Sequence, residues 1–124
     1  MALLKLTAGA MFVAGLIAPA TSYAQNAAGF GGTWKQIHSS AGDCSNCSIK
    51  IVSNDGTFLI TSSNGWAATA LADAPDHLNG TGNWDGTDQL SGPFKIAIKK
   101  NQEELILRIT FNRSGGTFVA RFSR

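Results

Sequence analysis

The sequence holds few of the residues that metal centres need. It has two histidines and two cysteines in 124 residues. Zinc sites take three or four ligands, and the N or S candidates here are His38, Cys44, Cys47 and His77, whose spacings match no common zinc site. There is also no Cys-x-x-Cys-His run for haem attachment. We therefore expect neither a metal nor another cofactor.

A large excess of charge of one sign is missing too. After residue 24, nine Lys and Arg (the ten of the whole chain without Lys5) stand against eight Asp and Glu. A nucleic-acid or anionic membrane partner would call for a clear cationic excess, so the composition predicts neither.

A catalytic constellation is also absent from the pattern. The aspartates fall where turns are expected, and turn chemistry explains them without a role in acid–base catalysis. His77 beside Asp76 is part of such a turn, and there is no Gly-x-Ser-x-Gly motif. We expect a protein that is not an enzyme.

The first 24 residues have the organisation of a secretory signal peptide. Lys5 precedes an apolar run from Leu6 to Ala18, and Ser22-Tyr23-Ala24 is a small-x-small cleavage site. The run is shorter than the roughly 20 residues of a membrane-spanning helix. The sequence thus predicts a cleaved helical leader at 1–24, a single domain at 25–124, and a secreted or periplasmic protein.

No stretch after residue 25 keeps a helical period for ten residues, whereas period-two alternation recurs. In "PFKIAIKK", for example, Phe94, Ile96 and Ile98 share one face, which is typical of a half-buried strand. Turn signals such as Asn54-Asp55-Gly56 separate the runs. The pattern predicts strands at 32–39, 48–53, 57–62, 65–72, 78–84, 93–100, 104–112 and 116–123.

Short connections between these strands favour an antiparallel meander. Closing eight strands into an up-and-down barrel removes both sheet edges, and a two-sheet sandwich is the alternative. The segment 73–92 stays open between a sharply bent strand containing Gly80 and Gly82 and a long irregular loop, a place where function often resides.

Trp34 opens the first strand after two glycines, in "FGGTWKQIHSS". A closed barrel needs a plug at its narrow end, and a cation from the last strand, Arg121 or Arg124, is placed to lie over the indole. The Gly32-Thr33-Trp34 triplet resembles the opening strand of the calycins: lipocalins, fatty-acid-binding proteins and avidins. The resemblance implies a calycin-like barrel in which Arg121, as the basic residue of the final strand, packs across Trp34.

Cys44 and Cys47, in "DCSNCS", should pair as a disulfide in an oxidising compartment. The alternative is thiol exchange, which usually needs a cysteine at a helix start beside positive charge. Asp43 and the following strand pattern disfavour that alternative.

The first hypothesis for function is a non-enzymatic binding protein with a small ligand at the open end of the barrel. His38 and Gln36 share parity with Trp34, which would turn them inward, and Trp66 and Trp84 flank small residues that can open a pocket. An interior fully packed by large apolar side chains would remove this hypothesis; the expected ones are Ile49, Ile51, Phe94, Ile96, Leu105, Leu107, Phe118 and Phe122.

The second hypothesis is a protein-binding module, such as an inhibitor of an extracellular protease or lysozyme. It would act through loops 41–47 and 73–92, the first of them pre-organised by the disulfide.

Overall fold

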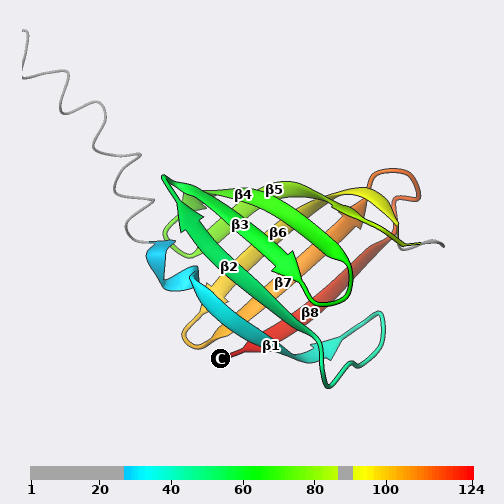
Figure 1. Ribbon diagram of the computed structural model, residues 1–124, viewed down its shortest axis with the longest axis horizontal. Coiled ribbons are helices and arrows are strands. Elements are labelled where there is room, and N and C mark those ends of the chain that lie inside the picture. Colours follow the sequence, from blue (N-terminus) through cyan, green and yellow to red (C-terminus); the bar gives the residue numbers. More distant parts are fainter. Residues whose placement is uncertain (1–26, 87–90) are drawn as a thin grey trace, which may run out of the picture.

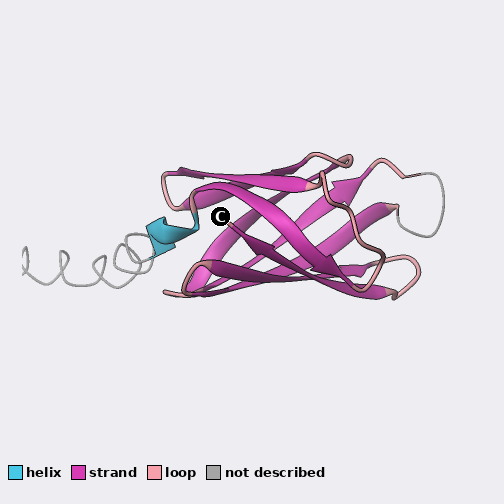
Figure 2. Ribbon diagram, turned by 90° about the horizontal axis from the view of Figure 1, so that it is seen from below, coloured by secondary structure: helices cyan, strands magenta, loops and turns pink. Residues whose placement is uncertain are grey.

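The computed structural model describes residues 27–86 and 91–124, and the predicted leader at 1–24 lies outside them. After the 3₁₀ helix η2 (Ala27–Phe30), the described chain forms eight antiparallel strands in one closed barrel, in sequence order (Figures 1 and 2). The strands are β1 (Gly32–Ser39), β2 (Ser48–Asn54), β3 (Thr57–Ser62), β4 (Trp66–Ala74), β5 (His77–Trp84), β6 (Gly92–Asn101), β7 (Glu104–Phe111) and β8 (Thr117–Ser123).

The pairing of the first strand with the last decides between barrel and sandwich. Lys35 on β1 pairs with Ser123 on β8, and Ser39 pairs with Ala120. Every strand therefore has two neighbours, and no edge is left to recruit another chain. The predicted all-β, eight-stranded up-and-down barrel is confirmed, and its architecture is consistent with a calycin-like barrel.

Alternation places one face of each strand in the core. Along β7, Leu105, Leu107 and Ile109 are fully buried while Ile106 and Arg108 are exposed. Each large aliphatic or aromatic side chain buried in this way contributes about 1.5–3 kcal/mol. All eight side chains expected to fill the interior are buried, so the middle of the barrel is packed and leaves no room for a ligand there. The packing is incomplete at one end, where Leu107, Phe118 and Phe122 also border a cavity.

The segment 73–92, which the sequence left open, is mainly strand. β5 runs through it to Trp84 and pairs along its whole length with β4 and β6. Its glycines allow a close approach, because a Cβ on Gly80 would lie 1.9 Å from the carbonyl oxygen of Thr69. Between β5 and β6, residues 85, 86 and 91 have no strand structure, and 87–90 lie outside the described part.

Trp34 plugs one end of the barrel, as its position predicted. The indole is fully buried, and its Nε1 donates a hydrogen bond to the carbonyl oxygen of Phe30, 2.9 Å away. Phe30 is itself buried in the core. The 3₁₀ helix thus closes this end beneath the tryptophan (Figure 1).

The assignment of Arg121 to Trp34 is wrong. The guanidinium over the indole is that of Arg124, 4.0 Å from the ring centroid, and it also donates hydrogen bonds to the carbonyl oxygens of Gly31 and Gly29. Arg121 lies between the inward Ala120 and Phe122 and so points outward. It forms a bidentate pair with Glu104 at 2.8 and 3.1 Å.

Candidate functional site

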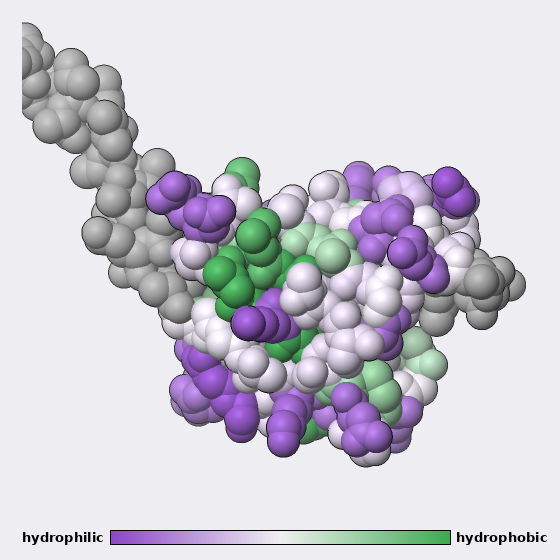
Figure 3. Space-filling view, in the orientation of Figure 1, coloured by the Kyte–Doolittle hydropathy of each residue, from purple (hydrophilic) through white to green (hydrophobic). Residues whose placement is uncertain are grey.

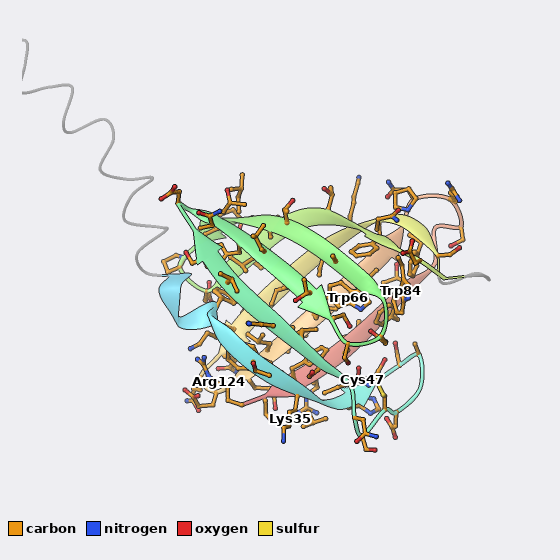
Figure 4. All side chains as sticks on the ribbon, viewed as in Figure 1. Lys35, Cys47, Trp66, Trp84 and Arg124 are labelled. Carbon is orange, nitrogen blue, oxygen red and sulfur yellow. A yellow bond between two sulfur atoms is a disulfide. The ribbon has the colours of Figure 1, made fainter. Side chains whose placement is uncertain are left out.

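A cavity of about 130 Å³ lies at the end of the barrel opposite Trp34. Trp66, Trp84 and Cys47 lie at this end, and Arg124 lies at the other (Figure 4). The space is bounded by the loop between β1 and β2, the start of β4, the end of β5 and the inner faces of β7 and β8. Its lining comprises Gln36, Ser39, Ala41, Gly42, Cys44, Cys47, Ser62, Asn64, Trp66, Trp84, Leu107, Phe118, Ala120 and Phe122.

Aromatic rings form one wall of the cavity. The centroids of Trp66 and Trp84, paired across β4 and β5, lie 6.2 Å apart. Trp84 is half-buried and stands edge-on to Phe118, with the centroids 5.9 Å apart. Such tilted and edge-to-face pairs hold the rings in defined positions, so the wall is a preformed apolar surface.

Short polar side chains form another part of the lining. Ser39 is buried, and its hydroxyl accepts a hydrogen bond from the backbone N–H of Ala41 at 3.1 Å. The hydroxyl of Ser62 donates to Asn64 Oδ1. The side-chain amide of Gln36 is half-buried and makes no hydrogen bond with any residue in 27–86 or 91–124, so it can bond to an incoming group.

The predicted disulfide is present and borders the cavity. Cys44 and Cys47 are joined, with their Cα atoms 5.4 Å apart, and the carbonyl of Cys47 accepts a hydrogen bond from the backbone N–H of Gln36 at 2.9 Å. The disulfide therefore constrains the 40–47 loop, and the hydrogen bond to Gln36 ties that loop to β1 beside the opening. A disulfide is consistent with an extracellular or periplasmic protein.

His38 does not line the cavity, contrary to the parity argument. The register of β1 against β8 shifts between Gln36 and His38, which marks a β-bulge. A bulge reverses the alternation after it, so Ser39 turns inward and His38 turns out. His38 is exposed, with its Nδ1 3.5 Å from Asp43 Oδ1.

The structure brings together three of the four expected ligand-site residues, Gln36, Trp66 and Trp84. Sequence reasoning missed Ser39, because a bulge leaves no composition signal here. It also missed Phe118 as a cavity residue, although its inward parity on the last strand was evident. Among the described lining residues, no side chain is ionisable apart from the cysteines, which the disulfide keeps from titrating.

Histidine pairs with an acid elsewhere. At the opposite end of β4, His77 Nδ1 lies 2.6 Å from Asp73 Oδ1, and Asn79 Nδ2 donates to Asp73 Oδ2. The hydrogen bond with His77 holds the pKa of Asp73 below its ordinary value. No serine, threonine or cysteine belongs to this described cluster, so it lacks a nucleophile that the pair could activate.

Two further findings bear on the chemistry of the described part. Within residues 27–86 and 91–124, no three His, Cys, Asp or Glu side chains gather closely enough to hold a metal ion. No helix in the same ranges has the length and hydropathy to cross a bilayer.

Comparisons with known proteins add no family assignment. A scan of protein-family models, a search of curated proteins and a search of solved structures each returned no match to this chain.

Proposed function

We propose that this protein is a secreted or periplasmic, non-enzymatic binding protein that holds one small uncharged ligand at the open end of its barrel. The cavity beside Trp66 and Trp84 carries the proposal. Apolar cavities of about 150 Å³ take a molecule the size of benzene, whereas drug-sized ligands need roughly 300–1,000 Å³. The volume of about 130 Å³ therefore favours a single ring or a short chain.

The lining defines the chemistry of this ligand. Burying a charge without a partner is costly, and the lining residues that the structure describes include no counter-ion. The aromatic wall suits the flat or apolar side of a ring. The free amide of Gln36 suits one hydroxyl, carbonyl or amide group on the opposite edge.

Native mass spectrometry of the mature protein from its own host tests the proposal. We expect an adduct with the mass of one small neutral molecule. In parallel, titration with phenol, benzyl alcohol and indole should change the fluorescence of Trp66 and Trp84. The absence of both an adduct and any fluorescence response would refute the proposal.

A matched pair of variants locates the site. Ala120→Leu adds side-chain volume within the cavity, because Ala120 is buried and lines it. Ala97→Leu makes the same change on the outer wall of β6. We expect the first to lower affinity for the ring ligand at least tenfold and the second to leave it unchanged. Equal affinity in both would place binding elsewhere.

A second candidate function, protein binding at the same end, rests on the rigid 40–47 loop. Besides the disulfide, backbone hydrogen bonds join Gly42 to Ser39 and Ser40 to Val119. Asp43, Ser45 and Asn46 are exposed on this loop. Pre-organised loops lose little entropy on docking, as an inhibitor of an extracellular protease or lysozyme requires.

The proposed second half of that surface is smaller than the sequence indicated. β5 occupies residues 77–84 of segment 73–92, and the turn at 75–76 lies at the opposite end of the barrel, so little of the described segment is available beside the 40–47 loop. The same mass-spectrometry experiment decides between the candidates, because a bound protein from the extract would favour the inhibitor and a small adduct the ligand carrier.

A further inference from the structure

The fold separates charges that nearly cancel in the sequence. Residues 91–124 contain seven Lys and Arg and two Glu, whereas residues 27–86 contain two Lys and five Asp. The side of the barrel built from β6, β7 and β8 is therefore cationic. These strands lie behind β2–β4 in Figure 1.

The wall built from β3, β4 and β5 has a different character. Its exposed outward side chains are mostly uncharged, among them Leu59, Leu71, Thr69 and Thr81. The side facing the viewer in Figure 3, over β2–β4, is largely pale and green, with few hydrophilic residues. The outer wall of β6–β8 thus differs in charge from the wall of β3–β5.

Three cations define the centre of the cationic wall. Lys95 and Lys99 point outward from β6, and Arg108 points outward from β7, where it pairs with Ala97 midway between the two lysines. Neighbouring strands lie about 4.8 Å apart and two residues along a strand span about 6.8 Å, so Arg108 is about 8 Å from each lysine at the Cα positions. All three side chains are exposed.

None of these three cations is neutralised by a described residue. Lys95, Lys99 and Arg108 form no ion pair within 27–86 and 91–124. Glu104, an acid on the same wall, is already held by Arg121 at 2.8 Å. The triangle therefore presents three uncompensated positive charges, which raise the local potential and attract anions.

Hydroxyl groups lie beside the cations. Thr110 is the partner of Lys95 on β7, and its hydroxyl lies 3.1 Å from that of Thr117 on β8. Aromatic side chains are missing from the outward positions of β6–β8 in the described chain. Single-stranded nucleic acids rely on such rings for base stacking, so this wall lacks what they need.

We propose that the outer wall of β6–β8 binds an acidic polysaccharide, with Lys95, Lys99 and Arg108 contacting successive carboxylate or sulfate groups. A linear polyanion can follow the zigzag of cations over the convex wall, and the threonine hydroxyls match sugar hydroxyls. A flat anionic bilayer fits less well, because Ile106, at 36% exposure, is the only large apolar side chain exposed among the outward positions of these described strands. Stable membrane attachment usually needs an apolar anchor besides charge.

Binding of the whole mature protein to polygalacturonate and dextran sulfate, measured by biolayer interferometry, tests this proposal. Neutral dextran is the ligand control. Each cation contributes about 0.7 to the slope of log affinity against log salt in single-stranded nucleic acids, so three cations should give a slope of about −2 on a polyanion of similar charge density. Vesicles of anionic phospholipid form a separate arm.

Two charge-reversal variants with the same net charge identify the surface. Lys95→Glu/Arg108→Glu alters the proposed wall, and Lys35→Glu/Lys50→Glu alters exposed lysines on β1 and β2. We expect the first to lose at least tenfold in affinity for both polyanions and the second to lose less than threefold. The neutral variant Lys95→Gln/Arg108→Gln repeats the test if the charge reversal impairs folding.

Three results would overturn the proposal. Failure to bind either polyanion at low salt would refute the proposal. Equal losses of affinity in the two charge-reversal variants would show that binding depends on net charge rather than on this wall. Binding to vesicles but not to polyanions would assign the wall to a membrane instead. Ring-ligand binding at the open end can survive any of these results, since the two sites share no residue.

Discussion

At the Trp34 end of the barrel, the connections between strands are two-residue turns, whereas at the cavity end they are longer. The turns of the closed end are 55–56, 75–76 and 102–103, and the connections of the open end are 40–47, 63–65, 85–91 and 112–116 (Figure 1). Short turns fix the register of strands, and longer ones carry binding residues. The two ends therefore divide structural and functional demands between them.

The interiors of the two ends also differ, because the Trp34 end is filled and the other end is open. Below Trp34 the space is filled by Phe30, and Arg124 covers the indole. At the other end the rings of Trp66 and Trp84 border an opening rather than closing it. An indole thus serves as a plug at one end and as a cavity wall at the other, and the difference lies in what covers it.

The largest expected effect comes from removing the plug. Trp34→Ala should lower the free energy of unfolding by about 3–5 kcal/mol, because it leaves a cavity and an unsatisfied carbonyl at Phe30. Trp84→Ala at the open end should cost roughly half as much, since that ring is only half-buried. Urea unfolding followed by circular dichroism measures both. Equal costs would break the comparison between the ends.

A smaller loss should follow from Arg124→Ala, about 2–3 kcal/mol. The variant removes a cation over the Trp34 ring and charge-assisted hydrogen bonds to the carbonyl oxygens of Gly29 and Gly31. Arg124→Lys should recover only part of it, because an ammonium lacks the planar fork. The control is Arg121→Ala on the outer surface, which should have a much smaller effect in thermal unfolding. A loss for Arg121 as large as for Arg124 would reverse our assignment.

Comparing a variant without the disulfide with Arg124→Ala should separate effects on stability from effects on ligand binding. Cys44→Ser/Cys47→Ser opens a very short loop, for which chain entropy predicts a loss of about 2 kcal/mol. Affinity for the ring ligand should fall as well, because the bridge borders the cavity. Arg124→Ala, measured at a temperature where it is folded, should leave that affinity unchanged. Calorimetric titration of both variants compares the two ends directly.

The smallest expected effect is a change in how thermal stability depends on pH. The hydrogen bond from Arg121 holds the pKa of Glu104 below its ordinary value, near the closed end. A carboxyl group with a lowered folded pKa stabilises the fold above its unfolded pKa, and this contribution disappears as the pH falls through the folded pKa. Glu104→Gln should therefore melt slightly below the wild type at about pH 6 and at the same temperature at about pH 2. A difference that persists in acid would exclude this ion pair as its cause.

Much of the fold was predictable because apolar and polar residues alternate along a half-buried strand. The runs in β6 and β7 alternate almost without exception, and Asp55-Gly56 marks a turn in which both residues take positive φ. The strand containing Gly80 and Gly82 was harder to predict, because two glycines remove the inward side chains on which the pattern depends.

The candidate site was predictable only in part. Trp66, Trp84 and Gln36 were expected at the open end, and they line the cavity. His38 was misplaced because parity holds only while the ladder is regular, and the bulge after Gln36 reverses it. Arg121 was chosen over Arg124 by resemblance to a family, although its own alternation with Ala120 and Phe122 indicated an outward direction.

The sequence by itself determined most of the strands and their inward faces, the disulfide and the plug, because each follows from local periodicity, spacing or side-chain size. Only the tertiary structure decided that the first and last strands meet and that a bulge puts Ser39 in the cavity. It alone also gathered Lys95, Lys99 and Arg108 on one wall. These features depend on how distant strands align, and neither composition nor local pattern records that alignment.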